Sequence, residues 1–267
     1  TFIVDSSGSG KDGVLTVKGA LIAKNTITVN DLDATTITGG AFADGLTGAA
    51  KADVISGLAG GDTIDGAGGA DTLTGGEGAD TITGGTGDDT IILTETTSAI
   101  DKVTLIASSN GKDTVTGFNS AKDIVNLEGS VTGADTAGAA TLAAINPALS
   151  TGNAAIDISG VIAVTDHVVT IGTALSSKGD LDAATDGSEL FKALSSSDNA
   201  ITGLTTDADH KGYFVAVQDG NSYVYQADAD ASSNTDTNLV ASEMSLVLIL
   251  QDVGVGELTA ADFAVIT

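Results

Sequence analysis

The chain of 267 residues carries 36 acidic residues against ten lysines and no arginine, which gives a formal net charge of −26. It has no basic patch that could neutralise phosphates, and this excludes nucleic acid and anionic membranes as expected partners. With 42% hydrophobic residues it is too apolar for a disordered acidic tail, and without cysteine it forms neither disulfides nor thiolate metal sites. A divalent cation is the partner that this charge favours.

The first 38 residues alternate apolar and polar side chains, as in GVLTVKG at 13–19 and NTITVNDLDATTITGG at 25–40. Such alternation predicts β-strands that lead into the segment after them. The amino end has no initiating Met and lacks the blocks of a signal peptide, so we expect a processed chain or the carboxyl-terminal part of a longer one. No run approaches the length of a membrane span, and we expect none.

Residues 39–92 are six consecutive units of nine residues: GGAFADGLT, GAAKADVIS, GLAGGDTID, GAGGADTLT, GGEGADTIT and GGTGDDTII. The sixth place is always aspartate, and the eighth is always leucine or isoleucine. Each unit has a glycine-rich half that suits positive φ and a half that suits a short strand. One unit therefore reverses the chain, and two units make one coil of eighteen residues.

Aspartates eighteen residues apart are expected to stack in two columns, because strands of successive coils lie about 4.8 Å apart. Calcium bonds oxygen at about 2.3 to 2.6 Å, so one ion fits between two stacked carboxylates, and glycine carbonyls of the adjoining turns would add further ligands. The candidate metal ligands are Asp44, Asp62 and Asp80 in one column, Asp53, Asp71 and Asp89 in the other, and Gly57, Gly66, Gly68, Gly75, Gly76, Gly84 and Gly85 in the turns.

The repeated segment is expected to stay open until calcium binds. Each unit buries one aliphatic side chain yet orders nine backbone residues, and its stacked carboxylates repel one another. The alternative is a glycine-rich solenoid whose aspartates cap turns without any metal.

The repeats resemble the GGxGxDxUx consensus of RTX, or hemolysin-type calcium-binding, proteins. The resemblance implies an all-β fold, namely a parallel β-roll with calcium in its turns, and it is best in the last three units. Phe42 and Lys51 replace glycine at the fourth place, and Ala49 and Leu58 replace it at the second. A lysine beside a calcium site should weaken binding, so the early turns are expected to bind calcium less well.

The segment NGKDTVTGFNSAKDIVNL, at 110–127, resembles the one that closes many RTX rolls. By this resemblance Asp113 and Asp123 join the metal ligands, and Phe118 plugs the open end of the coil. From its residues alone, the segment is two strands joined by a turn. We assign residues 93–130 as the roll-closing segment.

Residues 131–267 are expected to form a β-rich carboxyl-terminal region. The Ala-rich run 133–150 is a short helix or a loop. Strands are expected within 154–172, GSELFKAL at 187–194 has helical spacing, and YFVAVQDGNSYVYQ at 213–226 predicts a hairpin with Asp219 and Gly220 in its turn.

The last ten residues, LTAADFAVIT, resemble the uncleaved signal of RTX proteins exported by type I secretion, with an LTxxDF-like element. The resemblance implies a type I exporter as a partner in transit and a secreted, extracellular location at the cell surface. An amphipathic strand and turn packed on the domain is the alternative, and both can hold.

The sequence carries no constellation expected of an enzyme. His167 lies in an apolar run and His210 in a polar turn; neither belongs to an HExxH motif, and no GxSxG elbow occurs. We therefore expect no catalytic activity from this chain.

Two functions remain. The first is a calcium-binding structural protein that self-associates in a surface layer or extracellular matrix at the bacterial cell surface. The second is the calcium-binding export module of a secreted RTX protease or lipase. The Ala-, Gly-, Thr-, Ser- and Asp-rich composition is similar to that of surface-layer proteins exported by type I machinery, and it favours the first. An adhesin or ice-binding solenoid would need a broader Thr array than Thr63, Thr72, Thr81 and Thr90 supply.

Overall fold

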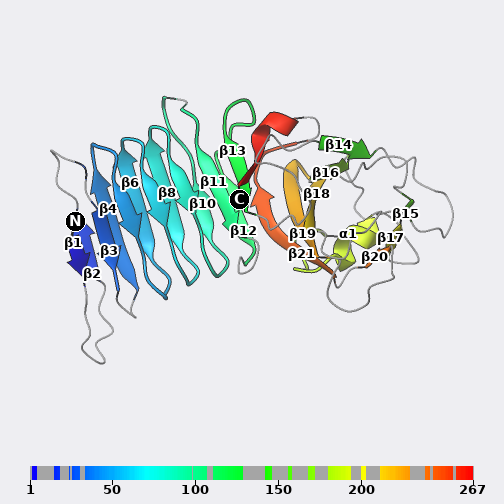
Figure 1. The fold of residues 1–267 in the computed structure, drawn as a ribbon, viewed down its shortest axis with the longest axis horizontal. Coiled ribbons are helices and arrows are strands. Elements are labelled where there is room, and N and C mark those ends of the chain that lie inside the picture. Colours follow the sequence, from blue (N-terminus) through cyan, green and yellow to red (C-terminus); the bar gives the residue numbers. More distant parts are fainter. Residues whose placement is uncertain are drawn as a thin grey trace. The chain divides into compact units, whose positions relative to one another are not determined.

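The computed structural model of the chain forms two compact units, residues 1–128 and 129–267. Figure 1 shows the strands and the single α-helix of the described residues. The structure describes residues 2–4, 15–18, 24, 26–30, 34–97, 99–106, 111–128, 142–145, 156–157, 168–171, 180–193, 200–202, 211–228, 238–240, 243–254 and 257–266.

The first unit is a parallel β-roll, as expected (Figure 1). Successive strands of this unit alternate between two sheets, and the strand pairs described within residues 1–128 run parallel. One sheet holds β1 (Phe2–Val4), β3 (Thr26–Val29), β5 (Gly45–Thr47), β7 (Thr63–Asp65), β9 (Thr81–Thr83), β11 (Lys102–Ile106) and β13 (Ile124–Glu128). The other holds β2 (Leu15–Lys18), β4 (Thr35–Gly40), β6 (Val54–Ala59), β8 (Thr72–Glu77), β10 (Thr90–Ile92) and β12 (Asp113–Thr116).

The core of the roll is a double stack of aliphatic side chains. The eighth residue of every repeat points inward and pairs in register with its equivalent eighteen residues away, because the side chains of a strand alternate between its two faces. The stacked residues are Ile37, Ile55, Leu73, Ile91 and Val115 in one sheet and Ile27, Leu46, Ile64, Ile82, Val103 and Val125 in the other, each at most 2% exposed.

The coil extends beyond the repeats in both directions. Strands β1 to β4 precede the first aspartate of the repeats, which confirms that the amino-terminal segment forms strands leading into the roll. Strands β12 and β13 lie in the 110–127 segment and continue the two sheets. Phe118 is buried there. That its side chain closes the open end of the coil stays a prediction.

The second unit is built around a mixed sheet. Parallel strands β14 (Leu142–Ile145) and β16 (Val168–Ile171) pair beside β18 (Lys211–Gln218), and β19 (Asn221–Asp228) and β21 (Met244–Leu250) follow antiparallel. Three short strands, β15 (Ile156–Asp157), β17 (Ala200–Thr202) and β20 (Asn238–Val240), form a second sheet. The remaining elements are α1 (Ser188–Ala193), a 3-10 turn η2 (Ala260–Asp262) and β22 (Phe263–Ile266).

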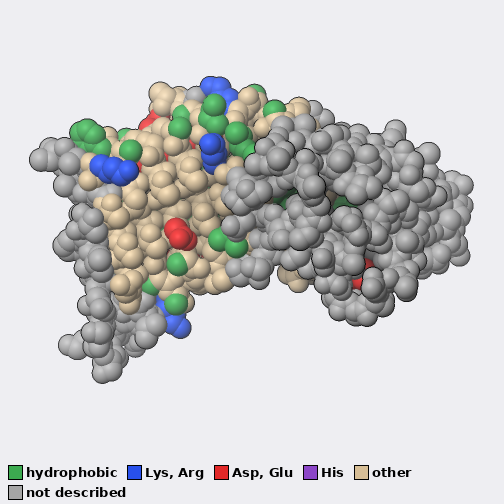
Figure 2. Space-filling model, in the orientation of Figure 1, with side chains coloured by type: hydrophobic (Ala, Val, Ile, Leu, Met, Phe, Trp, Pro, Cys, Tyr) green, Lys and Arg blue, Asp and Glu red, His purple; other side chains and the backbone are tan. Residues whose placement is uncertain are grey.

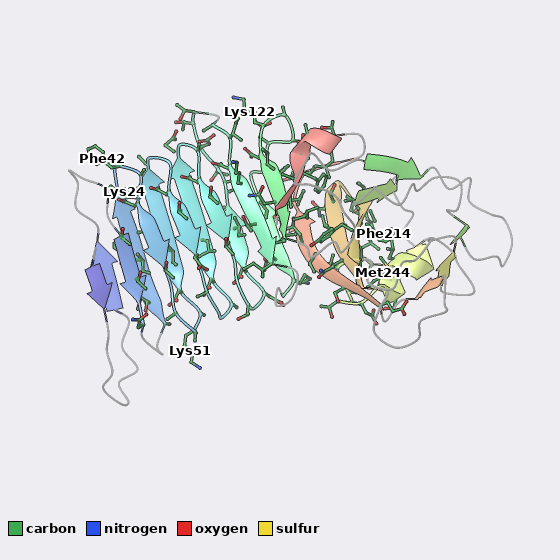
Figure 3. All side chains as sticks on the ribbon, viewed as in Figure 1. Lys24, Phe42, Lys51, Lys122, Phe214 and Met244 are labelled. Atoms are coloured by element: carbon green, nitrogen blue, oxygen red, sulfur yellow. The ribbon has the colours of Figure 1, made fainter. Side chains whose placement is uncertain are left out.

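The hairpin prediction is confirmed, since β18 and β19 pair from Gln218 and Asn221 outward. Asp219 and Gly220 have φ of 50° and 83°, the positive values that a tight hairpin turn requires. Phe214 and Met244, labelled in Figure 3, belong to the apolar core of this sheet.

Two further predictions meet the described residues of this unit. The helix expected in GSELFKAL is present as α1. The expectation of a helix or a loop for 133–150 is wrong where the structure describes that run, because residues 142–145 form strand β14 and pair with β16. Sheet pairing there outweighs the helical propensity of alanine.

The carboxyl-terminal LTAADF element is folded. The Asp262 carboxylate accepts the N–H of Thr259 at 2.5 Å and its hydroxyl at 2.8 Å, as in a capping box, and Phe263 is buried. His167 and His210 lie outside the described residues. No helix within the described ranges is long and apolar enough to cross a membrane.

Candidate metal centre

The aspartates of the repeats form two hydrogen-bonded ladders, one at each edge of the roll. The backbone N–H of each aspartate donates to Oδ1 of the aspartate one coil later. One ladder joins Asp44 to Asp62 and Asp62 to Asp80, both at 2.7 Å. The other joins Asp53 to Asp71 at 2.7 Å and Asp71 to Asp89 at 2.8 Å. The expected columns therefore form.

Both ladders continue past the repeats. Asp80 donates to Asp101 at 2.9 Å, and Asp101 donates to Asp123 at 3.0 Å. On the other edge Asp89 donates to Asp113 at 3.1 Å. All nine ladder aspartates are at most 3% exposed, and few acidic side chains are visible on the face of the roll drawn in Figure 2. The roll thus buries much of its negative charge.

The second carboxylate oxygen, Oδ2, separates eight of the nine ladder aspartates into two classes. In Asp44 and Asp53 it accepts the N–H of Gly40 at 2.7 Å and of Ala49 at 2.8 Å. In Asp123 it accepts the N–H of Asn119 at 2.8 Å. Among the described residues, the buried Oδ2 atoms without a hydrogen-bond partner are those of Asp62, Asp71, Asp80, Asp89 and Asp113.

Backbone conformation separates the turns in the same way. In the last four repeats the second and fourth residues have positive φ, whereas the first two turns, 39–43 and 48–52, contain no such residue. Those first turns carry Phe42 and Lys51 at the fourth place, where a Cβ disfavours positive φ. Both side chains point away from the roll (Figure 3). In these four turns, the residues with positive φ are Leu58 and Gly60, Ala67 and Gly69, Gly76 and Gly78, and Gly85 and Gly87.

The first glycine of each later repeat leaves room for acceptor oxygens to converge. A Cβ on Gly57 would strike Oδ2 of Asp62 and lie 2.6 Å from the Gly75 carbonyl oxygen. A Cβ on Gly84 would strike Oδ2 of Asp89 and lie 3.0 Å from that of Asp113. Carboxylate and carbonyl oxygens with no donor between them suit a hard cation.

Burial makes the bare carboxylates costly. It raises the pKa of Asp62 to about 6, of Asp71 and Asp80 to about 7, and of Asp113 to about 8. Backbone hydrogen bonds offset only part of this rise, and neighbouring carboxylates of the ladder add to it. Burial also raises the pKa of Asp89. These groups favour neutralisation by a proton or a cation.

Comparison with known families agrees with this geometry. A family model described as the RTX calcium-binding nonapeptide repeat, in four copies, matches residues 38–73 and 65–93. Residues 38–93 are RTX calcium-binding repeats. Their cofactor is calcium. Neither the curated proteins nor the solved structures gave a match.

The RTX repeats bring the sequence-predicted glycines into different positions. Gly57, Gly66, Gly75 and Gly84 each lie against Oδ2 of the aspartate of their own unit. Gly76 and Gly85 instead lie against the carbonyls of Leu58 and Ala67, and Gly68 lies beside Thr86. Which of these glycines bind the ion stays a prediction.

Sequence reasoning missed Asp101 in the ladder and Ala67 at the second place of an RTX repeat. Asp101 has no glycine-rich turn before it, but it precedes Val103 as Asp62 precedes Ile64. The spacing of aspartate, any residue and an inward aliphatic could have found it. The same signal marks Asp113 and Asp123.

An ion in the RTX turns would take much of its coordination from the backbone. Across the described ranges, no three His, Cys, Asp or Glu side chains gather so that they could hold one metal. Calcium prefers about six to eight oxygens and accepts carbonyls readily. The unpartnered Oδ2 atoms and the carbonyls of the next coil therefore fit calcium, which would supply the missing positive charge.

Proposed function

We propose that this chain is a secreted calcium-binding structural protein that folds on calcium after export and self-associates in a surface layer or extracellular matrix. The observation that carries the proposal is the run of five aspartates with a buried, unpartnered Oδ2 inside one solenoid. A metal-free solenoid with turn-capping aspartates would give those oxygens donors, as the first two turns do for Asp44 and Asp53.

Calcium would then decide where the protein folds. An unpartnered buried carboxylate is strongly unfavourable, so a cation that compensates its charge drives closure of the roll. Cytosol holds little free calcium, and the chain would stay extended enough to pass a type I exporter. Outside the cell, calcium near the extracellular range of about 0.1 to 1 mM would complete the fold.

Export and assembly rest on other features. The LTAADF element at the carboxyl end supports type I secretion, and its packed Phe263 suits a segment that folds after transit. Composition supports a structural layer, and the sheets of a solenoid end in strand edges that can pair with other copies. We propose no catalytic role.

Circular dichroism with and without a chelator tests the folding step. We expect the β-signal and the cooperative melting transition of the roll to disappear after exhaustive chelation and to return on calcium addition. An unchanged spectrum and melting temperature in chelator would contradict calcium-linked folding.

Sedimentation and negative-stain microscopy across a calcium titration test assembly. We expect sheets or filaments at millimolar calcium, because bound ions lower the net charge that keeps copies apart. A protein that folds on calcium addition yet remains monomeric would instead support the second candidate, the export module of an RTX enzyme.

A further inference from the structure

The stack of regular turns ends in an irregular loop between β10 and β11, of which residues 93–97 and 99–100 are described. The step from Asp80 to Asp101 is 21 residues instead of 18. No glycine-rich turn occurs in this loop. Instead Glu95, which is half-buried, and Glu77 of the preceding turn make its polar contacts.

Glu95 takes the place of a backbone carbonyl. In the regular turns the fourth-place N–H donates to the main-chain oxygen seventeen residues later, from Gly60 to Glu77 and from Gly69 to Thr86, both at 2.8 Å. The equivalent N–H of Gly78 donates to Oε2 of Glu95 at 3.2 Å. Oε1 of Glu95 accepts the N–H of Ala99. A carboxylate thus stands where the other turns have a neutral oxygen.

This carboxylate adds negative charge close to the aspartate ladder. Glu95 accepts the N–H of Gly78, two residues before Asp80, and the Asp80 N–H donates to Asp101 in the next coil. The Glu95 carboxylate is therefore held in the turn that leads to Asp80.

The environment of the Asp80 carboxylate indicates that a ligand binds here. It is 1% exposed, its Oδ2 has no hydrogen-bond partner, and that oxygen faces Gly75, the first residue of the turn whose Gly78 donates to Glu95. A buried unpaired oxygen beside an added carboxylate calls for a divalent cation.

We propose that Glu95 is a calcium ligand and that, with Oδ2 of Asp80, it forms the tightest calcium site of the roll. The inference rests on calcium binding by the repeats. Two carboxylates and the carbonyls of both turns supply the oxygens, in keeping with the lack of any three-carboxylate group in the described ranges. Affinity rises with the number of charged ligands, so this site fills first in a titration.

The competing interpretation is that Glu95 only holds the loop closed through Gly78 and Ala99. Glu95→Gln removes the charge and keeps only one of the two oxygens that accept the Gly78 and Ala99 N–H groups, so it needs a control that loses one acceptor oxygen in the same way. Glu77→Gln is the matched control. Glu77 is half-buried, like Glu95, and both of its carboxylate oxygens accept hydrogen bonds, from Thr96 and Thr97 in the same loop.

Calcium binding to the full chain is measured by titration calorimetry for wild type, E95Q and E77Q, with circular dichroism confirming folding at saturating calcium. We expect E95Q to weaken the tightest class of sites by about tenfold or to lose one ion, and E77Q to stay within about twofold of wild type. Binding by E95Q within about twofold of wild type, or an equal loss in both variants, overturns the inference.

If E95Q does not fold at any calcium concentration, Glu95→Asp decides the question. Folding of E95D, which keeps the charge, supports the site, whereas failure of both variants shows a purely structural role and overturns it. Absence of calcium binding in wild type would refute the proposed function together with the inference. Unchanged binding in E95Q refutes the inference alone.

Discussion

At the second place of the later turns, two residues with side chains adopt a conformation that favours glycine. Leu58 has a φ of 78° and Ala67 a φ of 71°, the region filled elsewhere by Gly76 and Gly85. The Leu58 side chain is 45% exposed, so it gains little from packing. The turn conformation that positions the aspartate carboxylates therefore forces Leu58 into this region, and it does so at a cost in backbone strain.

Leu58→Gly should therefore stabilise the calcium-bound roll by about 1 kcal/mol, because glycine adopts positive φ freely. Urea denaturation at saturating calcium measures the change. Ala49→Gly is the matched control, since Ala49 also stands at a second place but lacks positive φ. It should destabilise by about 0.5 to 1 kcal/mol through chain entropy. Equal signs for the two variants would contradict the strain argument.

Aspartates should differ in how much calcium affinity they supply. Asp71→Asn or Asp80→Asn removes the charge of an unpartnered buried Oδ2, whereas Asp44→Asn changes an oxygen already bonded to Gly40. We expect the calcium midpoint of folding to rise by about tenfold for the first two and by about twofold for the third. Calcium titrations followed by circular dichroism provide the midpoints, and three equal midpoints would remove the distinction between early and late turns.

At the level of the element, the roll without calcium is a stack of buried acids. The folded-state pKa values of Asp62, Asp71, Asp80 and Asp113 lie at about 6 to 8, above the ordinary value of 3.8. A raised folded-state pKa stabilises the fold at low pH, and this contribution disappears as the pH rises through the folded-state value. Glu77, whose pKa is lowered to about 2 by hydrogen bonds from Thr96 and Thr97, acts in the opposite sense.

In calcium-depleted buffer, lowering the pH from about 8 to about 5 should therefore increase the β-signal and melting temperature of the roll. Thermal melts at several pH values follow this change. Asp113→Asn removes the group with a pKa of about 8 and should flatten the upper part of the pH profile. A melting temperature that falls steadily on acidification would contradict the prediction.

For the whole molecule, the two units bury different kinds of side chain. Every unpartnered buried side-chain oxygen found in the described ranges belongs to the roll. In the second unit the buried polar groups have partners: Gln218 accepts the Leu181 N–H at 2.9 Å, and the Ser222 hydroxyl donates to the Val253 carbonyl at 2.8 Å. The described core of β18, β19 and β21 is otherwise apolar.

Hydrogen exchange of the full chain should show this difference directly. On chelation, amides in 54–92 should lose protection, whereas those in 213–226 and 244–250 should keep it, because only the first set depends on calcium. Mass spectrometry of the peptides reads out both regions in one sample. Simultaneous loss of protection in both regions would show that calcium controls the fold of the entire chain.

The nine-residue register alone was enough to predict the parallel coil, its inward aliphatic stack and its two aspartate columns, because these depend on strand periodicity and a constant coil length. Local turn chemistry likewise sufficed for Asp219 and Gly220 in the hairpin. Domain boundaries at 38, 92 and 130 stay predictions; the coil runs through the first two without a break.

Only the tertiary structure decided which carboxylate oxygens lack a hydrogen-bond partner. Both classes of turn contain the same aspartate, and they differ in the backbone conformation of the turn. It also placed Asp101 after Asp80 in the ladder and Glu95 on the N–H of Gly78, because the step of 21 residues from Asp80 to Asp101 departs from the eighteen-residue period of the repeats. Strand β14, in an Ala-rich run without strand periodicity, forms through pairing with β16, a contact between distant parts of the chain that local propensity does not encode.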